Sequence, residues 1–201
     1  MGKLITVVGN SGVGKTTFTR QLSRYLPLMH ALEQHAERPF QASFAFDLHK
    51  LALPNQVDYL LFRAEQELDI RKRDGIGIQD GGLDEDFQVF TRHFFRKGYL
   101  SEPEFRLCER LYGLTRDLLP PPNLVIHLTA PLEVIRERFA RRNRSLEIAQ
   151  LPDLPDLEFL LQDWVAGISP LTLLTVDAGE DDPDYDNIIP PLLPQIETIL
   201  F

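Results

Sequence analysis

The chain has 201 residues, of which 43% are hydrophobic, and this is enough for one globular domain with its own core over residues 1–201. The net charge of −9 argues against general nucleic-acid binding, and no apolar run approaches the length that spans a membrane. A single cysteine, Cys108, excludes an internal disulfide and fits a reducing compartment, so a cytoplasmic protein is expected.

The first predicted element is a buried strand from Lys3 to Val8, and a glycine-rich loop follows it directly. Residues 9–16 fit the phosphate-loop pattern G-x-x-x-x-G-K-[ST], and apolar residues at helical spacing continue from Thr16 to Tyr25. In this setting the loop N–H groups bind phosphate, Lys15 reaches the terminal phosphates and the Thr16 hydroxyl coordinates Mg²⁺. The residues predicted to contact ATP here are Gly9, Asn10, Ser11, Gly12, Val13, Gly14, Lys15, Thr16 and Thr17.

The rest of the chain is predicted to alternate between strands and helices. The expected strands are 28–32, 75–80, 123–129 and 171–176. The expected helices are 41–53, a long helix 55–73 that Pro54 opens, 84–96, 102–118, a helix that starts at Pro131, 156–165 and 188–201. This alternation predicts an α/β fold, with a parallel sheet covered by helices on both faces.

Ligands of such sheets bind beyond the carboxyl ends of the strands, and acids are predicted at two of these ends. Glu33 follows the second strand and Asp80 ends the third. The Asn-Lys-x-Asp pattern of switch GTPases is absent, and the third strand is too short for a motor or transporter ATPase. Two acids beside a phosphate loop instead suit phosphoryl transfer to a small acceptor, with one carboxylate as base and the other at Mg²⁺.

An arginine-rich segment follows the fourth predicted strand. Such a run is usually a solvated helix face, but small phosphate-loop kinases carry a mobile lid at this place in the chain. Position and charge therefore favour a lid at about 138–150, with Arg138, Arg142 and Arg144 neutralising charge on the transferred group.

The chain resembles the deoxynucleoside kinase family, and the shared residues run along most of its length. They are the phosphate loop 9–17, Glu33 six residues before Pro39, Phe44 and Asp47 followed by Gln56, Asp80, Phe90, and 142–147 in the pattern Arg-x-Arg-Ser-x-Glu. The resemblance implies a phosphate-loop kinase with a five-stranded parallel sheet and an arginine-rich lid, which uses ATP and Mg²⁺.

The resemblance also implies a role for each matching residue. Glu33 is the catalytic base, Lys15, Arg138 and Arg142 stabilise charge, and Thr16 with Asp80 holds the metal. Arg142 and Arg144 contact ATP. The residues implied to contact the nucleoside are Glu33, Phe44, Gln56, Arg63, Asp80, Asp86, Phe90 and Glu147.

Within that set, Gln56 has the donor and acceptor to pair with a base edge, and Phe90 offers a ring to stack on the base. Arg63 and Asp86 match positions where the deoxycytidine and deoxyguanosine kinases carry charged residues beside the base, although each on its own also fits a surface ion pair. The pair favours a base with an amino or keto edge over thymine, so a purine deoxynucleoside is the expected substrate.

Two positions depart from the family pattern. Gly81 replaces an arginine that holds the 5′ end of the substrate, and Ala45 replaces a tyrosine that contacts the 3′-hydroxyl, which Glu147 can still bind. These departures keep a nucleotide-binding regulatory subunit open as an alternative function. A nucleoside monophosphate kinase is a second alternative, for which Arg38 or Arg71 would bind the phosphate of the acceptor. The family pairs through helices, here 55–73 and 102–118, so a homodimer or a pair with a related subunit is expected.

Overall fold

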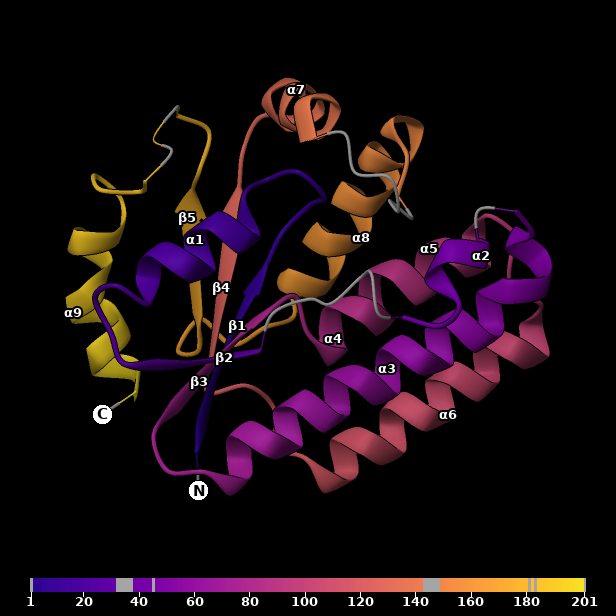
Figure 1. Ribbon diagram of the computed structural model, residues 1–201, viewed down its shortest axis with the longest axis horizontal. Coiled ribbons are helices and arrows are strands. Elements are labelled where there is room, and N and C mark those ends of the chain that lie inside the picture. Colours follow the sequence, from indigo (N-terminus) through magenta and orange to yellow (C-terminus); the bar gives the residue numbers. More distant parts are fainter. Residues whose placement is uncertain are drawn as a thin grey trace.

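Five short apolar segments pair in parallel to form one sheet in the order β2-β3-β1-β4-β5 (Figure 1). The computed structural model describes residues 2–31, 38–44, 46–142, 149–180, 182 and 184–200. The strands are β1 (Lys3–Val8), β2 (Leu28–Ala31), β3 (Ile76–Asp80), β4 (Leu124–Thr129) and β5 (Leu173–Asp177). The central strands are apolar along their length because helices cover them on both sides.

Helices make up most of the remaining chain, in agreement with the predicted alternation. They are α1 (Lys15–Leu22), α2 (Gln41–Phe44), α3 (Leu48–Lys72), α4 (Leu83–Glu85), α5 (Arg92–Arg96), α6 (Glu102–Leu118), α7 (Leu132–Arg142), α8 (Leu154–Val165) and α9 (Ile189–Leu200), with a π-helix η2 (Asp86–Thr91) and a 3₁₀ turn η3 (Leu151–Asp153). Within the described part of the chain, none of these helices has the length and apolarity needed to cross a bilayer.

Alternate residues of β1 serve two different cores, as the period of a strand requires. Ile5 and Val7 pack in the core that α1 and α9 cover. Val8 points to the other face, where the leucines of α8 bury it. On that same face Gly77 of β3 lets Ile70 of α3 approach closely. Both faces are therefore covered, and the predicted α/β architecture with a five-stranded parallel sheet is confirmed.

The prediction that Pro54 opens a long helix is wrong. Helix α3 already begins at Leu48, where the Asp47 side chain caps it by accepting the Lys50 N–H at 3.1 Å, and it continues through Pro54. Proline removes one backbone hydrogen bond inside a helix. Burial of this first part of α3 against Phe94 and Leu100 opposes that loss, and sequence reasoning gave the burial no weight.

Two further helices differ in detail from the prediction. Helix α1 ends at Leu22 rather than at Tyr25, because the amides of Arg24 and Tyr25 bond three residues back in a tight turn. The predicted helix 84–96 contains the π-helix η2, in which the Thr91 hydroxyl lies 2.9 Å from the Asp86 carbonyl. A π-turn accommodates one extra residue and is frequent at functional sites.

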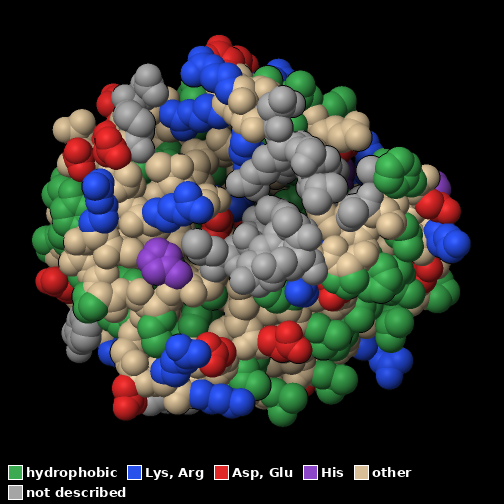
Figure 2. All heavy atoms as spheres, viewed as in Figure 1, with side chains coloured by type: hydrophobic (Ala, Val, Ile, Leu, Met, Phe, Trp, Pro, Cys, Tyr) green, Lys and Arg blue, Asp and Glu red, His purple; other side chains and the backbone are tan. Residues whose placement is uncertain are grey.

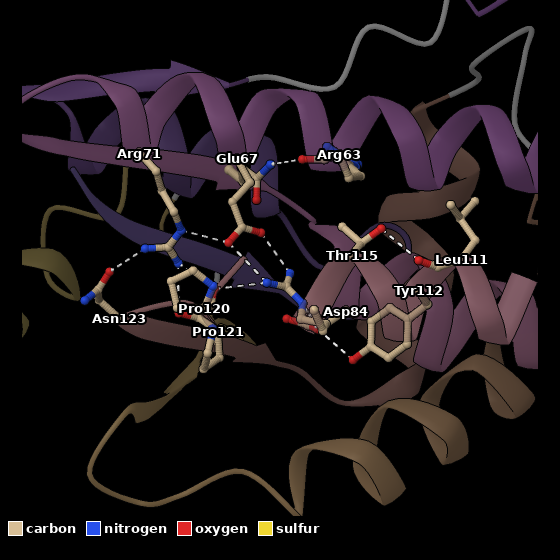
Figure 3. A network of polar contacts seen from close by, with 12 residues as sticks. Arg63, Glu67, Arg71, Asp84, Leu111, Tyr112, Thr115, Pro120, Pro121 and Asn123 are labelled. Atoms are coloured by element: carbon tan, nitrogen blue, oxygen red, sulfur yellow. Dashed lines mark hydrogen bonds and ion pairs between the residues drawn. The ribbon is translucent and has the colours of Figure 1, made fainter. Parts of the chain in front are cut away.

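Helices α3 and α6 lie side by side and are joined by a buried network of charges (Figure 3). Glu67 of α3 accepts from Arg71 at 3.0 Å and from Arg116 of α6 at 2.8 Å. Arg116 also binds Asp84 of α4 at 2.8 Å, and the Tyr112 hydroxyl donates to the same carboxylate. The network fixes the helix pair against the segment that follows β3, which carries the candidate site described below.

Candidate functional site

The phosphate loop connects β1 to α1 at the carboxyl end of the sheet, as predicted. Gly14 caps α1 with φ 117°, and a side chain there would collide with the hydroxyl of Tyr185, so only glycine suits the position. The loop is anchored from behind by Asn10, whose Nδ2 donates to the Leu154 carbonyl at 3.0 Å and to Glu158 at 2.9 Å. Helix α8 therefore holds the loop in place.

Lys15 lies inside the loop, where a lysine can follow a transferred phosphate. Its Nζ donates to the Gly9 carbonyl and lies 3.7 Å from Oε1 of Glu85. The same Glu85 oxygen accepts the Gly9 N–H at 2.8 Å. The Lys15 ammonium is thus held by a carbonyl and a carboxylate oxygen, and phosphate oxygens could take their place.

Thr16 and Asp80 meet at the edge of the loop, as the metal-site prediction requires. The Thr16 hydroxyl donates to Oδ2 of Asp80 at 2.5 Å, while the buried Oδ1 of Asp80 has no partner among the described residues. Mg²⁺ in kinases is commonly held by one or two protein oxygens together with substrate phosphates and water. No group of three metal-ligating side chains occurs in the described ranges, so a hydroxyl and one carboxylate are the site that this part of the chain offers.

A buried ion pair lies further along the same edge of the sheet. The Nε of Arg63 donates to Oδ2 of Asp86 at 2.8 Å, and the two side chains are only 2% and 8% exposed. Nearby, Thr91 donates to Oε1 of Gln56 at 2.8 Å. Phe90 is half-buried and packs against the core under α8. Arg63 and Asp86 therefore sit together, as the sequence predicted, and Thr91 of η2 ties Gln56 to the same region.

The two described arginines of the predicted lid are placed on α7, beside the loop. Arg138 donates to three backbone carbonyls, those of Val13 at 3.3 Å, Ala178 at 2.6 Å and Glu180 at 2.9 Å. Arg142 lies with its guanidinium carbon 5.6 Å from the Phe139 ring centre. Figure 2 shows Lys and Arg side chains gathered over this end of the molecule. Arg138 thus fastens α7 to the phosphate loop and to the segment after β5.

Several predicted site residues lie outside what the structure describes. Glu33, Arg144 and Glu147 fall in the ranges 32–37 and 143–148, and nothing is described of Ala45 or of the Phe44 side chain. Their roles remain predictions from the resemblance.

Among the residues around the phosphate loop, sequence reasoning missed the buried acid Glu85. Burial raises its pKa to about 7, while Lys15 and the Gly9 N–H act in the opposite direction. In the sequence it belongs to the run Asp84-Glu85-Asp86, which looks like a solvated helix face. The one available signal was its position shortly after Asp80, which the sequence already placed beside the phosphate loop at the carboxyl end of the sheet.

Comparison with known proteins gives one consistent result. The family model described as deoxynucleoside kinase matches residues 5–196. The deoxyadenosine/deoxycytidine kinase of Bacillus subtilis (strain 168) is 25% identical over 194 residues, which cover 92% of this chain and 89% of that protein. The deoxyguanosine kinase of the same strain is 25% identical over 185 residues, covering 89% and 87%.

The fold has close counterparts among solved structures. A deoxyadenosine kinase from M. mycoides, determined with the products dCMP and a flexible dCDP, superposes with a TM-score of 0.82 at 21% identity. The match covers 97% of this chain and 99% of that one. At this identity the likeness establishes the shared fold.

Proposed function

Because the chain belongs to the deoxynucleoside kinase family, a family of phosphotransferases, we propose that it transfers the γ-phosphoryl group of ATP to the 5′-hydroxyl of a purine deoxynucleoside. The observation that carries the proposal is the placement of Arg63 and Asp86 as a buried pair at the same edge of the sheet as the phosphate loop. The names of both curated relatives support it, because each includes a purine deoxynucleoside, although the first also includes deoxycytidine.

In the proposed reaction the 5′-oxygen bonds to the γ-phosphorus and the bond from that phosphorus to the bridging oxygen breaks, which releases ADP. Glu33 accepts the proton of the hydroxyl, and Lys15 stabilises the charge that develops on the transferred group. Thr16 and Asp80 fit Mg²⁺, which when bound would neutralise phosphate charge. Arg138 positions the loop from α7, and Arg142 and Arg144 complete the lid.

The base is read, in this proposal, by the Arg63–Asp86 pair, with Gln56 opposite and Phe90 stacked. Ionised Asp86 only accepts hydrogen bonds and Arg63 only donates, so together they satisfy a purine ring nitrogen and exocyclic group. Thymine would leave part of the pair unsatisfied, at a cost of about 1–3 kcal/mol for each buried polar group. We therefore expect deoxyadenosine or deoxyguanosine to be the best substrate, deoxycytidine next and thymidine the poorest.

The test is kcat/KM for the four deoxynucleosides with ATP and Mg²⁺, in the parent and in the double variant Arg63→Met/Asp86→Ala. The double variant should shift the ranking towards thymidine by roughly tenfold or more, since it removes both charges at once. A matched control is Arg92→Ala/Asp163→Ala, which removes a 3.0 Å ion pair elsewhere and should keep the parent ranking. A parent that prefers thymidine would contradict the assignment of these residues to the base.

The alternative of a monophosphate kinase finds little support in the arginines expected to bind the acceptor phosphate. Arg71 donates to Glu67 and to the carbonyls of Pro120 and Pro121, just before β4, and so lies at the amino end of the sheet, away from the phosphate loop. Arg38 pairs with Asp58 at 3.3 Å. Deoxynucleoside monophosphates in the same assay should therefore give no turnover as acceptors. Binding of ATP without turnover of any nucleoside would instead favour a regulatory subunit.

The proposed enzyme pairs as a homodimer through α3 and α6, with a related subunit as the alternative partner. The helices carry exposed leucines, and Figure 2 shows apolar side chains over this side of the molecule. They are Leu61 and Leu68 on α3, and Leu107, Leu114 and Leu118 on α6. The α6 leucines recur at helical spacing and form one stripe, the kind of surface that a two-fold interface covers.

The dimer is tested by light scattering at micromolar concentration. The parent should have twice the mass of the chain, and Leu114→Glu/Leu118→Glu should be monomeric, because it places charges where two copies would exclude water. Leu171→Glu is the control, since Leu171 is 80% exposed like Leu118 at 83% but lies on neither helix. A parent that is monomeric, or a double variant that stays dimeric, would contradict this interface.

A further inference from the structure

Glu85 is a carboxylate built into the phosphate loop from outside it. It ends the short helix α4, which follows β3 after the turn Gly81-Gly82. Its Oε1 accepts the Gly9 N–H at 2.8 Å and lies 3.7 Å from Nζ of Lys15, and the side chain is 3% exposed. An anion therefore already contacts the lysine that the proposed reaction needs for the donor's phosphates.

The space for this carboxylate depends on Gly81. A Cβ at Gly81 would lie 2.9 Å from Oε2 of Glu85 and 2.9 Å from Nη2 of Arg63, and the backbone there has φ 74°. Any side chain at position 81 would therefore press on both groups. Both contacted atoms are the ends of flexible side chains, so a larger residue at position 81 would displace Glu85 or Arg63 from the places they occupy here. Gly81 thus leaves room for Glu85 at its place beside Lys15.

The charged groups around Glu85 come from three directions. Lys15 faces it from α1, Arg63 from α3, and Asp86 follows it in η2. Burial raises the pKa of Glu85 to about 7, Lys15 and Arg63 lower it, and Asp86 raises it further. Lys15 is the strongest of the charges that keep the carboxylate ionised, so the ionisation of Glu85 depends on where the Lys15 ammonium lies. His127 also lies near Lys15, but burial lowers its pKa from the usual range.

We propose that Glu85 is a positioning residue of the donor site, which holds Lys15 when the site is empty and competes with the donor's phosphates for it. The inference rests on the proposed use of ATP. When Lys15 moves to the phosphates, Glu85 keeps the Gly9 N–H but loses its cation and gains an anionic neighbour. An uncharged Glu85 is not repelled by the bound phosphates. Donor binding is therefore tighter at pH values where Glu85 is protonated.

The test is the Kd for ATP with Mg²⁺, measured by calorimetry from pH 6 to pH 8 on the parent and on Glu85→Gln. Glutamine keeps the size and the acceptor for Gly9 but exerts no charge on Lys15. The parent should bind ATP more weakly as the pH rises through about 7, by at most tenfold per pH unit, because one proton is taken up on binding. Glu85→Gln should bind equally well at both ends of the range, so the variants converge at pH 6 and differ about tenfold at pH 8.

Glu158→Gln is the matched control, because Glu158 contacts the loop through Asn10 and not through Lys15. It should keep the parent's pH dependence. An affinity of the parent that does not change across pH 7 would overturn the inference, whatever the variants do. An equal pH dependence in the parent and in Glu85→Gln would overturn it as well. A parent that binds no ATP at any pH would instead refute the proposed function, so the two failures are distinguishable.

Discussion

Lys15→Ala is expected to lower kcat by about a thousandfold and to leave the chain folded. Lys15 is the one side-chain cation inside the phosphate loop among the described residues, and its Nζ contacts the carbonyls of Gly9 and Asn10 and lies 3.7 Å from Glu85. A charge placed where negative charge develops contributes more to the transition state than to the bound substrate, so kcat falls more than binding. Glu85 loses its cation in this variant, but its raised pKa lets it become neutral.

The measurement is steady-state turnover with ATP and the preferred deoxynucleoside, together with a thermal unfolding curve. Lys97→Ala serves as the control, because Lys97 also makes an ion pair, with Asp153 at 2.8 Å, but lies away from the loop. Its turnover should match that of the parent. Near-normal turnover in Lys15→Ala would show that residues 9–16 do not bind the transferred phosphate.

The elements that sequence reasoning predicted well are those that local pattern determines. The strand β1, the phosphate loop and α6 follow from a continuous apolar run, glycine spacing and apolar residues at helical spacing, each of which is complete within a few residues. The pairing of Arg63 with Asp86 was also predicted, although these residues are far apart in the sequence. That success came from resemblance to a family, since spacing alone gives no reason to pair them.

The errors arose where long-range packing decides the outcome. Pro54 is a strong local signal for a helix start, but Phe94 and Leu100 bury the turns before it and the helix continues through the proline. Glu85 was overlooked because three adjacent acids indicate a solvated face. Its burial depends on the position of the phosphate loop, 76 residues earlier in the chain, which no local pattern encodes.

Arg116→Ala is expected to destabilise the fold by about 3–5 kcal/mol, because it leaves two buried carboxylates short of a cation. Arg116 binds Glu67 and Asp84 at 2.8 Å each, and Glu67 is fully buried (Figure 3). Arg71 still pairs with Glu67, and Tyr112 still donates to Asp84, so part of the network survives. The measurement is the free energy of unfolding from urea titration at pH 7.5.

The matched control is Arg106→Ala on the same helix. Arg106 also makes two ion pairs, with Glu102 and Glu109, but all three side chains are exposed, so the loss of stability should be far smaller than in Arg116→Ala. The pH adds a second criterion. Burial raises the pKa of Asp84 and Arg116 lowers it, so in the folded variant the pKa rises further. A raised carboxyl pKa favours the folded state at low pH and costs stability as the pH rises. Arg116→Ala should therefore lose more stability at pH 7.5 than at pH 5, and an equal loss at both values would show that packing rather than charge accounts for it.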